Sequence, residues 1–396
     1  MTPAARDAAA MAVLDRWLGG QPLEAALTGW ARASRYAGSK DRAAVRDTVF
    51  DAVRRKRSCF ALGGAQTGRG LLIGLARLHD DGLSRWNGQG YAPSPLTQNE
   101  QALMNRAVPD LSRGERLDCP DWLLPFLDRA LGEEQADLTL SAFHNRAPVF
   151  LRINLGKTPS EQLDPFRASL IDELAAQGIV ARRHPLAETA LSVSGETRRI
   201  KLLDSYLDGR IELQDVASQA VALDFFDAVA PDSAVLDYCA GGGGKALALA
   251  ALGLPVTAYD IDENRMRDIP VRAQRAGVEI PLLSQAPAAL WPAILADAPC
   301  SGSGSWRRTP EAKWDFTREK LQALTMRQDE ILSKTAALTA PGGVLGYATC
   351  SILVEENEDR VNGFVQSHAG WSLTAERRLG PLDGGDGFYL AILQRG

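Results

Sequence analysis

The second half of the chain alternates short apolar strands with a glycine-rich turn and a helix, and this pattern restricts the possible folds most. The expected elements are a strand over 233–237, a glycine loop over 241–244, a helix over 245–252 and a strand over 256–260. Such alternation is typical of a mainly parallel sheet covered by helices. We therefore predict a doubly wound α/β domain over residues 214–396.

Two other segments precede this domain, as expected for 396 residues at about 150 residues per domain. In the first, apolar residues such as Met11, Leu14 and Leu18 recur at helical spacing, and Thr97 with Glu100 has the pattern of a capping box. The second predicts a strand over 149–154, a helix over about 160–177 and short strands up to 213. We predict two further parts, which are an all-helical domain over 1–140 and a small α+β segment over 145–213.

The composition excludes several classes of protein. The net charge is −5, so any RNA-binding surface must be a local basic patch on an acidic background. Five cysteines without a CxxC pair and four scattered histidines predict neither a disulfide framework nor a metal site. No segment has the roughly 20 apolar residues of a membrane span, and charges interrupt the N-terminal 20 residues. We expect a cytoplasmic, monomeric protein with no membrane partner.

The segment from Asp237 to Lys245 reads Asp-Tyr-Cys-Ala-Gly-Gly-Gly-Gly-Lys. Glycines directly after a strand allow a sharp turn and close approach of a nucleotide-like ligand at the carboxyl edge of the sheet. The spacing matches neither the GxGxxG nor the Walker pattern, and a plain flexible turn is the alternative. Asp260 ends the next strand and could accept two hydrogen bonds from a ribose diol, or could instead cap a helix.

Two cysteines follow two later strands. One motif is Asp297-Ala-Pro-Cys300 and the other is Tyr347-Ala-Thr-Cys350. Either cysteine by itself is more often structural, a small buried apolar group. Because both motifs follow short apolar strands, we expect both thiols and the Asp297 carboxylate at the same edge of the sheet as the glycine loop.

Two thiols and a carboxylate beside a nucleotide-type site suit one reaction in particular. Carbon 5 of cytosine is too electron-poor to attack a methyl sulfonium directly. A thiolate that adds to carbon 6 makes carbon 5 nucleophilic. The ring then needs a proton or hydrogen bond at N3, which a protonated Asp297 could supply. Afterwards the carbon 5 proton and the thiol must both leave, which calls for a second basic group.

Cations and aromatic side chains follow Cys300. Arg307, Arg308 and Lys313 lie between Trp306 and Trp314, a combination that suits RNA phosphates and an unstacked base, although an ordinary solvated loop is the alternative. A second cluster at 54–57 could equally be the solvated end of a helix. Five further cations give the middle segment a basic character, namely Arg182, Arg183, Arg198, Arg199 and Lys201.

These motifs resemble the Nop/Sun family of RNA cytosine-C5 methyltransferases over essentially the whole chain. Cys239–Lys245 stands where the family has Cys-Ala-Ala-Pro-Gly-Gly-Lys, Asp297–Ser301 matches DAPCS, and Tyr347–Ser351 matches YATCS. Further matches are Arg307-Arg308 with Pro310 and Lys313-Trp314 for RR.P..KW, Glu355–Asn357 for EEN, Asp386–Phe388 for DGF, Gln214-Asp215 with Ser218, and Pro120 with Trp122-Leu123. The helix around Asp41-Arg42 is similar to that of a NusB-like domain.

The resemblance implies a class I (Rossmann-like) methyltransferase sheet, a NusB-like helical domain and an RRM-like middle segment. It implies that S-adenosylmethionine donates the methyl group and that the substrate is small-subunit (16S) ribosomal RNA. Cys350 would be the nucleophile, Cys300 would help to eliminate it, Asp297 would contact the base, and Lys245 would reach the base or that carboxylate. The cofactor would be held by Cys239, Ala240, Gly241, Gly242, Gly243, Gly244, Lys245, Asp260, Gln285 and Asp297. The RNA would contact Arg307, Arg308 and Lys313.

The chain departs from the family pattern at two places. Gly241-Gly242 replaces Ala-Pro, and Ala246 replaces Thr after the lysine. The family has Gly-Asp after the third strand, where the nearest match here is Ser284-Gln285. These departures leave an RNA-binding assembly factor with a degenerate cofactor site as an alternative. A nicotinamide dehydrogenase, and the DNA-methyltransferase arrangement with Cys300 as nucleophile, are further alternatives.

Overall fold

The computed structural model describes residues 1–158 and 160–396, which form two compact units. The helical unit comprises Met1–Arg146 together with Trp306–Asp315, and the second unit comprises Ala147–Ser305 and Phe316–Gly396. The sequence assigned residues 306–315 to the α/β domain, so this part of the expected division was wrong. The physical reason is that Trp306 is only 1% exposed and packs edge-on against Phe143 in the helical unit.

The helical unit is built around three helices, α1 (Pro3–Leu18), α3 (Ser39–Arg54) and α5 (Gly68–Leu78), which contribute buried apolar residues to one core. The other helices of this unit are α2 (Leu23–Ala33), α4 (Lys56–Gly63), α6 (Gln98–Asn105), α7 (Arg113–Arg116), α8 (Leu124–Leu131), α9 (Glu133–Ala142) and α15 (Pro310–Asp315). The capping box expected at Thr97 and Glu100 begins α6 and is confirmed. The all-helical prediction for this region is confirmed as well.

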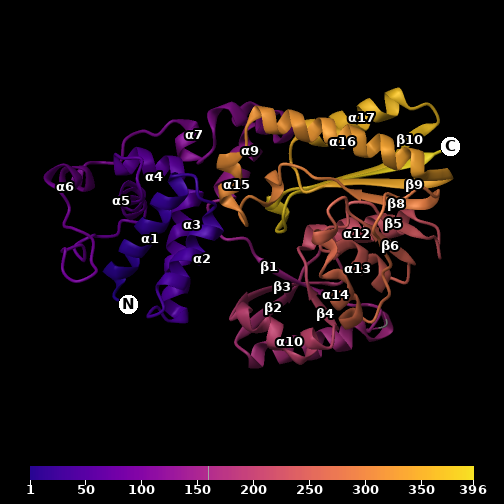
Figure 1. Cartoon of the computed structure of the whole chain (residues 1–396), viewed down its shortest axis with the longest axis horizontal. Helices are drawn as coiled ribbons and strands as arrows, with labels where there is room; N and C mark the ends of the chain where they lie inside the picture. The colour runs from indigo at the N-terminus through magenta and orange to yellow at the C-terminus, as the bar shows by residue number, and fades with distance from the viewer. Residues whose placement is uncertain (159) are drawn as a thin grey trace. The chain divides into compact units, whose positions relative to one another are not determined.

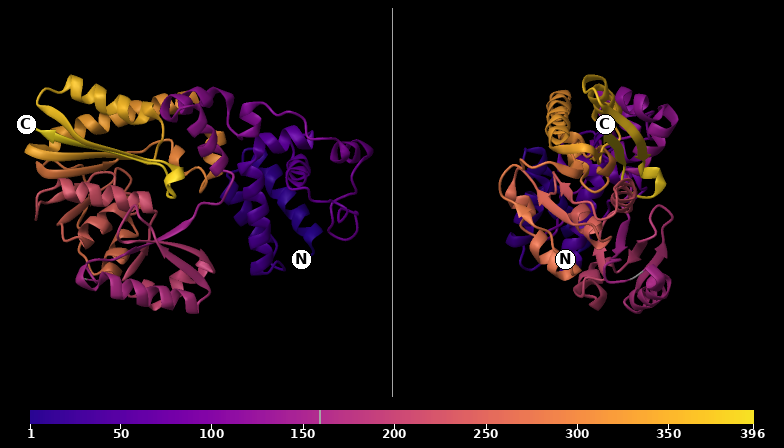
Figure 2. Two further views of the ribbon diagram at one scale, coloured as in Figure 1. Left: turned by 180° about the vertical axis from the view of Figure 1, so that it is seen from behind. Right: turned by 90° about the vertical axis from the view of Figure 1, so that its right-hand side faces the viewer.

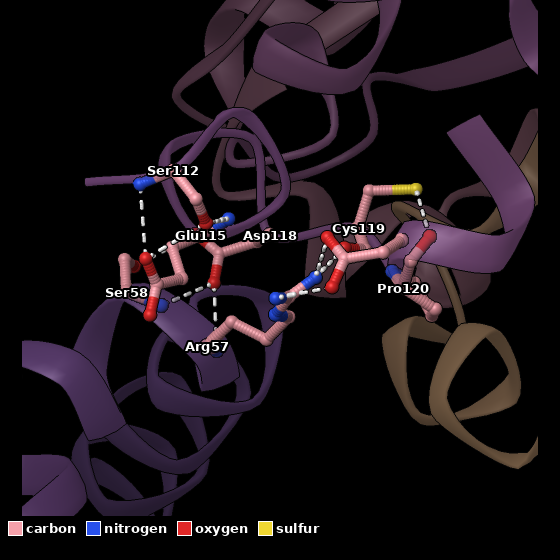
Figure 3. A network of polar contacts seen from close by, with 8 residues as sticks. Arg57, Ser58, Ser112, Glu115, Asp118, Cys119 and Pro120 are labelled. Carbon is pink, nitrogen blue, oxygen red and sulfur yellow. Dashed lines mark hydrogen bonds and ion pairs between the residues drawn. The ribbon is translucent and has the colours of Figure 1, made fainter. Parts of the chain in front are cut away.

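A polar network closes the N-terminal end of α4 (Figure 3). The Asp118 carboxylate is fully buried and accepts hydrogen bonds from the backbone N–H of Arg57 and Ser58, each at 2.9 Å, and from the Ser58 hydroxyl. Arg57 in turn donates to the Cys119 carbonyl and to Asp121. These bonds satisfy backbone donors that an uncapped helix would leave unpaired. They also connect α4 to the chain 60 residues further on.

A small antiparallel sheet begins the second unit. Its strands are β1 (Val149–Ile153), β2 (Ile179–Arg183), β3 (Ala190–Gly195) and β4 (Ile211–Leu213), in the order β2-β3-β1-β4. Helix α10 (Leu163–Ala176) packs Leu170 and Leu174 against Leu151 and Leu191 of this sheet. The α+β prediction for this segment is confirmed, with the α-helix beginning at 163 after a 3₁₀ turn.

A seven-stranded sheet forms the rest of the second unit. Its strands are β5 (Val235–Asp237), β6 (Val256–Tyr259), β7 (Leu282–Leu283), β8 (Trp291–Asp297), β9 (Thr339–Thr349), β10 (Trp371–Leu379) and β11 (Phe388–Arg395). The order is β10-β11-β9-β8-β5-β6-β7, with β11 antiparallel to both of its neighbours and the others parallel. This is the predicted Rossmann-like methyltransferase sheet.

Helices cover both faces of this sheet, as Figures 1 and 2 show. One face carries α12 (Val216–Ala228), α13 (Gly244–Ala251) and α14 (Ile269–Ala276), and the other carries α16 (Arg318–Leu338) and α17 (Glu358–Ser367). A short helix, α11 (Asp204–Leu207), precedes β4. Because both faces are covered, the central strands are apolar throughout, as in Ala293–Ala296 of β8.

The strand order reverses between β5 and β8: from β5 the chain adds β6 and β7 on one side, and it then returns to add β8 and β9 on the other side of β5. Ligands of open parallel sheets bind beyond the carboxyl ends of the strands at such a reversal. Asp237 ends β5, Asp297 ends β8 and Thr349 ends β9. The topology therefore brings the residues singled out in the sequence to one edge. In the described part of the chain, no helix combines the length and apolar character needed to cross a membrane.

We expect Trp306→Ala to destabilise the helical unit by about 3–5 kcal/mol, because it empties the volume of a fully buried indole. Native-state hydrogen exchange would report the effect as faster exchange of amides in the helical unit, first of all in α9, whose C-cap residue is Phe143. Tyr91→Ala, at a ring that is 80% exposed in the same unit, is the matched control and should change little. Faster exchange confined to the seven-stranded sheet would contradict the assignment of residue 306 to the helical unit.

Candidate active site

The glycine loop connects β5 to α13 and has a backbone that favours glycine at two positions. Gly241 and Gly243 have φ angles of +49° and +77°, which disfavour any residue with a side chain. A Cβ at Gly243 would also lie 2.7 Å from Cγ1 of Ile269. These constraints favour a turn of defined geometry over the alternative of a plain flexible turn.

Asp260 lies at the carboxyl end of β6, directly beside this loop. Its carboxylate is 2% exposed and accepts hydrogen bonds from the N–H of Gly241 at 2.9 Å and of Asp262 at 3.0 Å. Arg265 adds an ion pair at 3.1 Å. The following 3₁₀ turn is capped by Asp262, so the alternative role of Asp260 as a helix cap is wrong.

These residues fit a cofactor with a ribose. The Asp260 carboxylate has two oxygens with about four lone-pair directions, three of which these partners use, so about one remains for a ribose hydroxyl beside the loop. Gly244 begins α13, whose N-terminal backbone amides follow the loop directly. Gln285 is exposed two residues after β7, at the same edge of the sheet. Burial raises the pKa of the Cys239 thiol, which suits a structural position beneath the loop.

Lys245 and Asp297 form an ion pair at the centre of the edge. Lys245 Nζ lies 2.7 Å from Asp297 Oδ2 and 4.6 Å from the centre of the Phe388 ring. The lysine side chain is buried, whereas one third of the aspartate side chain is exposed. Asp297 can therefore meet a ligand from solvent while Lys245 holds a proton behind it.

Asp237 is a further member of this group that the sequence did not single out as a site residue. It is buried beside Asp297 and Lys245, and burial first and the Asp297 charge second raise its pKa to about 7. Within the part of the chain that the structure describes, its Oδ1 has no hydrogen-bond partner. The only signal in the sequence was an acidic residue that ends an apolar strand.

Cys300 and Cys350 come together as the motifs predicted. The Sγ atoms are 3.3 Å apart, and both side chains are half-buried. The pairing of β8 with β9 places Asp297 opposite Ala348, so the two loops leave the sheet side by side. The hydrogen bond with Cys350, followed by burial, raises the pKa of Cys300 well above its usual value, and this keeps the Cys300 thiol protonated.

The proposed basic surface after Cys300 differs from the expectation. Arg307 and Lys313 are only 7% and 2% exposed, within the helical unit, and Lys313 Nζ lies over the Trp314 ring. This burial argues against direct RNA contact by these two side chains, and their RNA-binding role stays a prediction, whereas Arg308 is exposed. They are buried beside the tryptophans of the same segment: Trp306 packs against Phe143, and Trp314 packs against the core of the helical unit.

The second basic cluster, residues 54–57, also has partners within its unit. Arg55 pairs with Asp51, Arg57 pairs with Asp121, and Lys56 lies over the rings of Trp17 and Trp314. These contacts favour the structural interpretation of this cluster over RNA contact. Among the residues described, no group of three or more His, Cys, Asp or Glu is arranged to hold a metal ion.

The raised pKa of Asp237 predicts a pH-dependent cost of burial. The folded protein binds a proton at Asp237 up to about pH 7, whereas the unfolded chain releases it near 3.8. The contribution of Asp237 to the free energy of unfolding therefore falls as the pH rises from 3.8 to about 7. We expect Asp237→Asn to gain stability relative to the wild type across this window, by up to about 4 kcal/mol.

Urea unfolding at pH 5 and pH 8 measures this difference. The exposed Asp227→Asn on α12 serves as the control and should give the same difference from the wild type at both pH values. A gap between Asp237→Asn and the wild type that stays constant or narrows with rising pH would show that Asp237 is not held protonated.

Comparison with known proteins agrees with this geometry. Residues 226–393 match the family model described as 16S rRNA methyltransferase RsmB/F. Ribosomal RNA small subunit methyltransferase B of Erwinia tasmaniensis is 33% identical over 295 residues, which cover 69% of this chain and 66% of that protein. The enzyme of the same name from Yersinia pseudotuberculosis is 31% identical over 290 residues, 69% of this chain and 65% of the relative. The chain thus spans just under two thirds of the length of these relatives.

Solved structures share the fold. The protein PH0851 superposes over 100% of this chain and 99% of its own, with a TM-score of 0.76 and 20% identity. A methyltransferase homolog from Pyrococcus horikoshii covers 72% of this chain and 98% of its own, with a TM-score of 0.61 and 25% identity. NSun6 from the same organism, solved with SFG, has a TM-score of 0.59 at 18% identity and covers 70% of this chain and 98% of its own. The chain belongs to the Nop/Sun family, as an RsmB-like protein.

Proposed function

We propose that the protein transfers a methyl group from S-adenosylmethionine to carbon 5 of a cytosine in small-subunit ribosomal RNA. The observation that carries this proposal is the pair of sulfurs 3.3 Å apart at the edge of the sheet where the Lys245–Asp297 ion pair also lies. The description of the matching family and the names of the relatives support the RNA substrate. The glycine loop and Asp260 would hold the cofactor, with Gln285 as a neutral partner for its adenine.

The first step uses Cys350 as nucleophile. Its thiolate forms a bond to carbon 6 of the cytosine, and the electron pair of the C5–C6 double bond moves toward N3 and carbon 5. Asp297 is placed to give N3 a proton that it takes in turn from the Lys245 ammonium, to which its Oδ2 is hydrogen-bonded. Until the base arrives, that proton stays on the lysine of the ion pair. Carbon 5, now electron-rich, accepts the methyl group that the cofactor supplies when bound.

The second step restores the aromatic ring. The carbon 5 proton leaves, its bonding pair reforms the C5–C6 double bond, and the C6–S pair departs on the Cys350 sulfur. Cys300 is placed to relay protons here, because its protonated thiol lies 3.3 Å from that sulfur. It gives its own proton to the departing thiolate and takes the carbon 5 proton, so that Cys300 ends as it began. The Cys350 thiol then loses its proton to solvent, which regenerates the thiolate. N3 returns its proton through Asp297 to Lys245, which restores the ion pair.

Substitution of the two cysteines tests their roles. We expect Cys350→Ala to lower methyl transfer by at least about 10³-fold, the order seen when a covalent nucleophile is lost. Cys300→Ala should form the adduct and fail to resolve it, so a protein–RNA band resistant to denaturant accumulates. Adduct in the Cys350 variant and none in the Cys300 variant would assign the nucleophile to Cys300, as in DNA cytosine methyltransferases. Sequencing of 5-methylcytosine in rRNA with and without the protein identifies the target.

The alternative is an RNA-binding assembly factor with a degenerate cofactor site, which Gln285 and the Gly241-Gly242 replacement favour. Calorimetry with S-adenosylmethionine decides between the two. We expect binding by the wild type and affinity at least about tenfold lower for Asp260→Asn, because a hydrogen bond to a charged group contributes roughly 1.5–3 kcal/mol. Asp262→Asn, which keeps a good capping residue at an exposed position, is the control. No heat from the wild type at millimolar cofactor supports the alternative.

RNA would contact the second unit through the cations of the small sheet and its 3₁₀ turn, all of them exposed: Arg182, Arg183, Arg198, Arg199 and Lys201. Exposed Arg308 adds a cation in the helical unit. Such contacts act on the phosphate backbone and make binding depend on salt concentration. The cytoplasmic location and the monomeric state stay predictions.

A further inference from the structure

Glu356 is a fully buried carboxylate directly behind the two cysteine loops. Its Oε1 accepts from the Ser301 backbone N–H at 2.8 Å and from Gln328 Nε2 at 3.1 Å. Its Oε2 accepts from the hydroxyls of Ser301 and Ser351. Ser301 follows Cys300 and Ser351 follows Cys350, so one side chain joins both loops.

Two of these donors have a fixed direction, because the Ser301 backbone N–H and the Gln328 amide can only donate. The Ser351 hydroxyl accepts from the Leu353 N–H at 3.0 Å and the Ser301 hydroxyl accepts from the Ser303 N–H at 3.2 Å. Each hydroxyl can then donate its proton to Glu356, and the Ser351 hydroxyl also lies 2.9 Å from that of Ser303. An ionised carboxylate can accept all four hydrogen bonds, whereas an amide would turn its NH2 group toward one pair of donors.

Neighbouring bonds hold the same loops from other sides. Gln328 of α16 donates to the carbonyl of Pro299, the residue before Cys300, as well as to Glu356. Asn357 donates to the Ser351 carbonyl and accepts from the Thr349 hydroxyl, on either side of Cys350. The Tyr347 hydroxyl donates to the Glu356 carbonyl at 2.7 Å. Removing hydrogen bonds from a buried carboxylate is costly, so Glu356 and the two loops are held in one well-defined arrangement.

We infer that Glu356 is a positioning residue that sets the distance between the two sulfurs and, through its charge, keeps the shared proton on Cys300 rather than on Cys350. This inference rests on the proposed roles of the two thiols. The hydrogen bond with Cys350 and burial raise the pKa of the Cys300 thiol most, and the negative charges of Cys350 and Glu356 add to them. A protonated Cys300 leaves Cys350 as the sulfur that can attack.

Glu356→Gln tests the inference, with Glu330→Gln at an exposed position of α16 as the matched control. We expect Glu356→Gln to lower kcat at least about tenfold, the cost of one lost charged hydrogen bond, with KM for RNA and cofactor changed less than about twofold. In a Cys350→Ala background, the pH midpoint for alkylation of Cys300 by iodoacetamide, located by peptide mass spectrometry, should fall when Glu356 becomes Gln. A purely structural role would not move that midpoint.

A second variant separates the effect of Glu356 on the distance between the two sulfurs from the effect of its charge. Ser301→Ala removes one donor and leaves the carboxylate ionised, so kcat should fall without a lower alkylation midpoint. If thermal melting shows Glu356→Gln to be unfolded, Ser301→Ala decides by itself, and an unchanged kcat in that variant overturns the positioning role. An unchanged or higher midpoint in folded Glu356→Gln overturns the electrostatic role. Alkylation needs no methyl transfer, so a wild type without activity refutes the proposed function and leaves this result interpretable.

Discussion

The parallel pairing of β8 with β9 is the constraint on which the proposed chemistry depends. Their register places Asp297 opposite Ala348, so the segments that follow must leave the sheet beside each other. Two cysteines that are 50 residues apart in the chain therefore end with their sulfurs 3.3 Å apart. A shift of the register by one residue would turn the side chains of one strand to the other face and separate the pair.

Two groups of buried charged side chains lie at this edge of the sheet, and they differ in how many of their hydrogen bonds are made. Glu356 receives donors on both oxygens and has no capacity left for a ligand, which suits a group that holds loops in place. Asp237, Lys245 and Asp297 are less complete, because one Asp237 oxygen has no partner among the described residues and Asp297 is partly exposed. Incompletely paired, partly accessible charges are where proton transfer is expected.

The segment from 306 to 315 illustrates where reasoning along the chain fails. Its arginines, lysine and tryptophans have the composition of an RNA-binding loop, and its place after Cys300 suggested the catalytic domain. In the structure Trp306 and Lys313 are buried in the helical unit. An aromatic residue beside a cation suits a buried cation–π contact as well as a nucleic-acid surface. Composition cannot distinguish the two, because the difference lies in which distant residue, here Phe143, supplies the opposite wall.

The sequence by itself determined the alternation that specifies a Rossmann-like sheet, the glycine loop with its acidic partner, and the placement of two thiols after two strands. Those features are local, since strand period, glycine conformation and motif spacing each depend on a few consecutive residues. Only the tertiary structure decided that Asp237 joins the Lys245–Asp297 pair, that Glu356 bonds to both cysteine loops, and that residues 306–315 complete the helical core. Each of these requires residues that are brought together by burial and strand order, which no local pattern encodes.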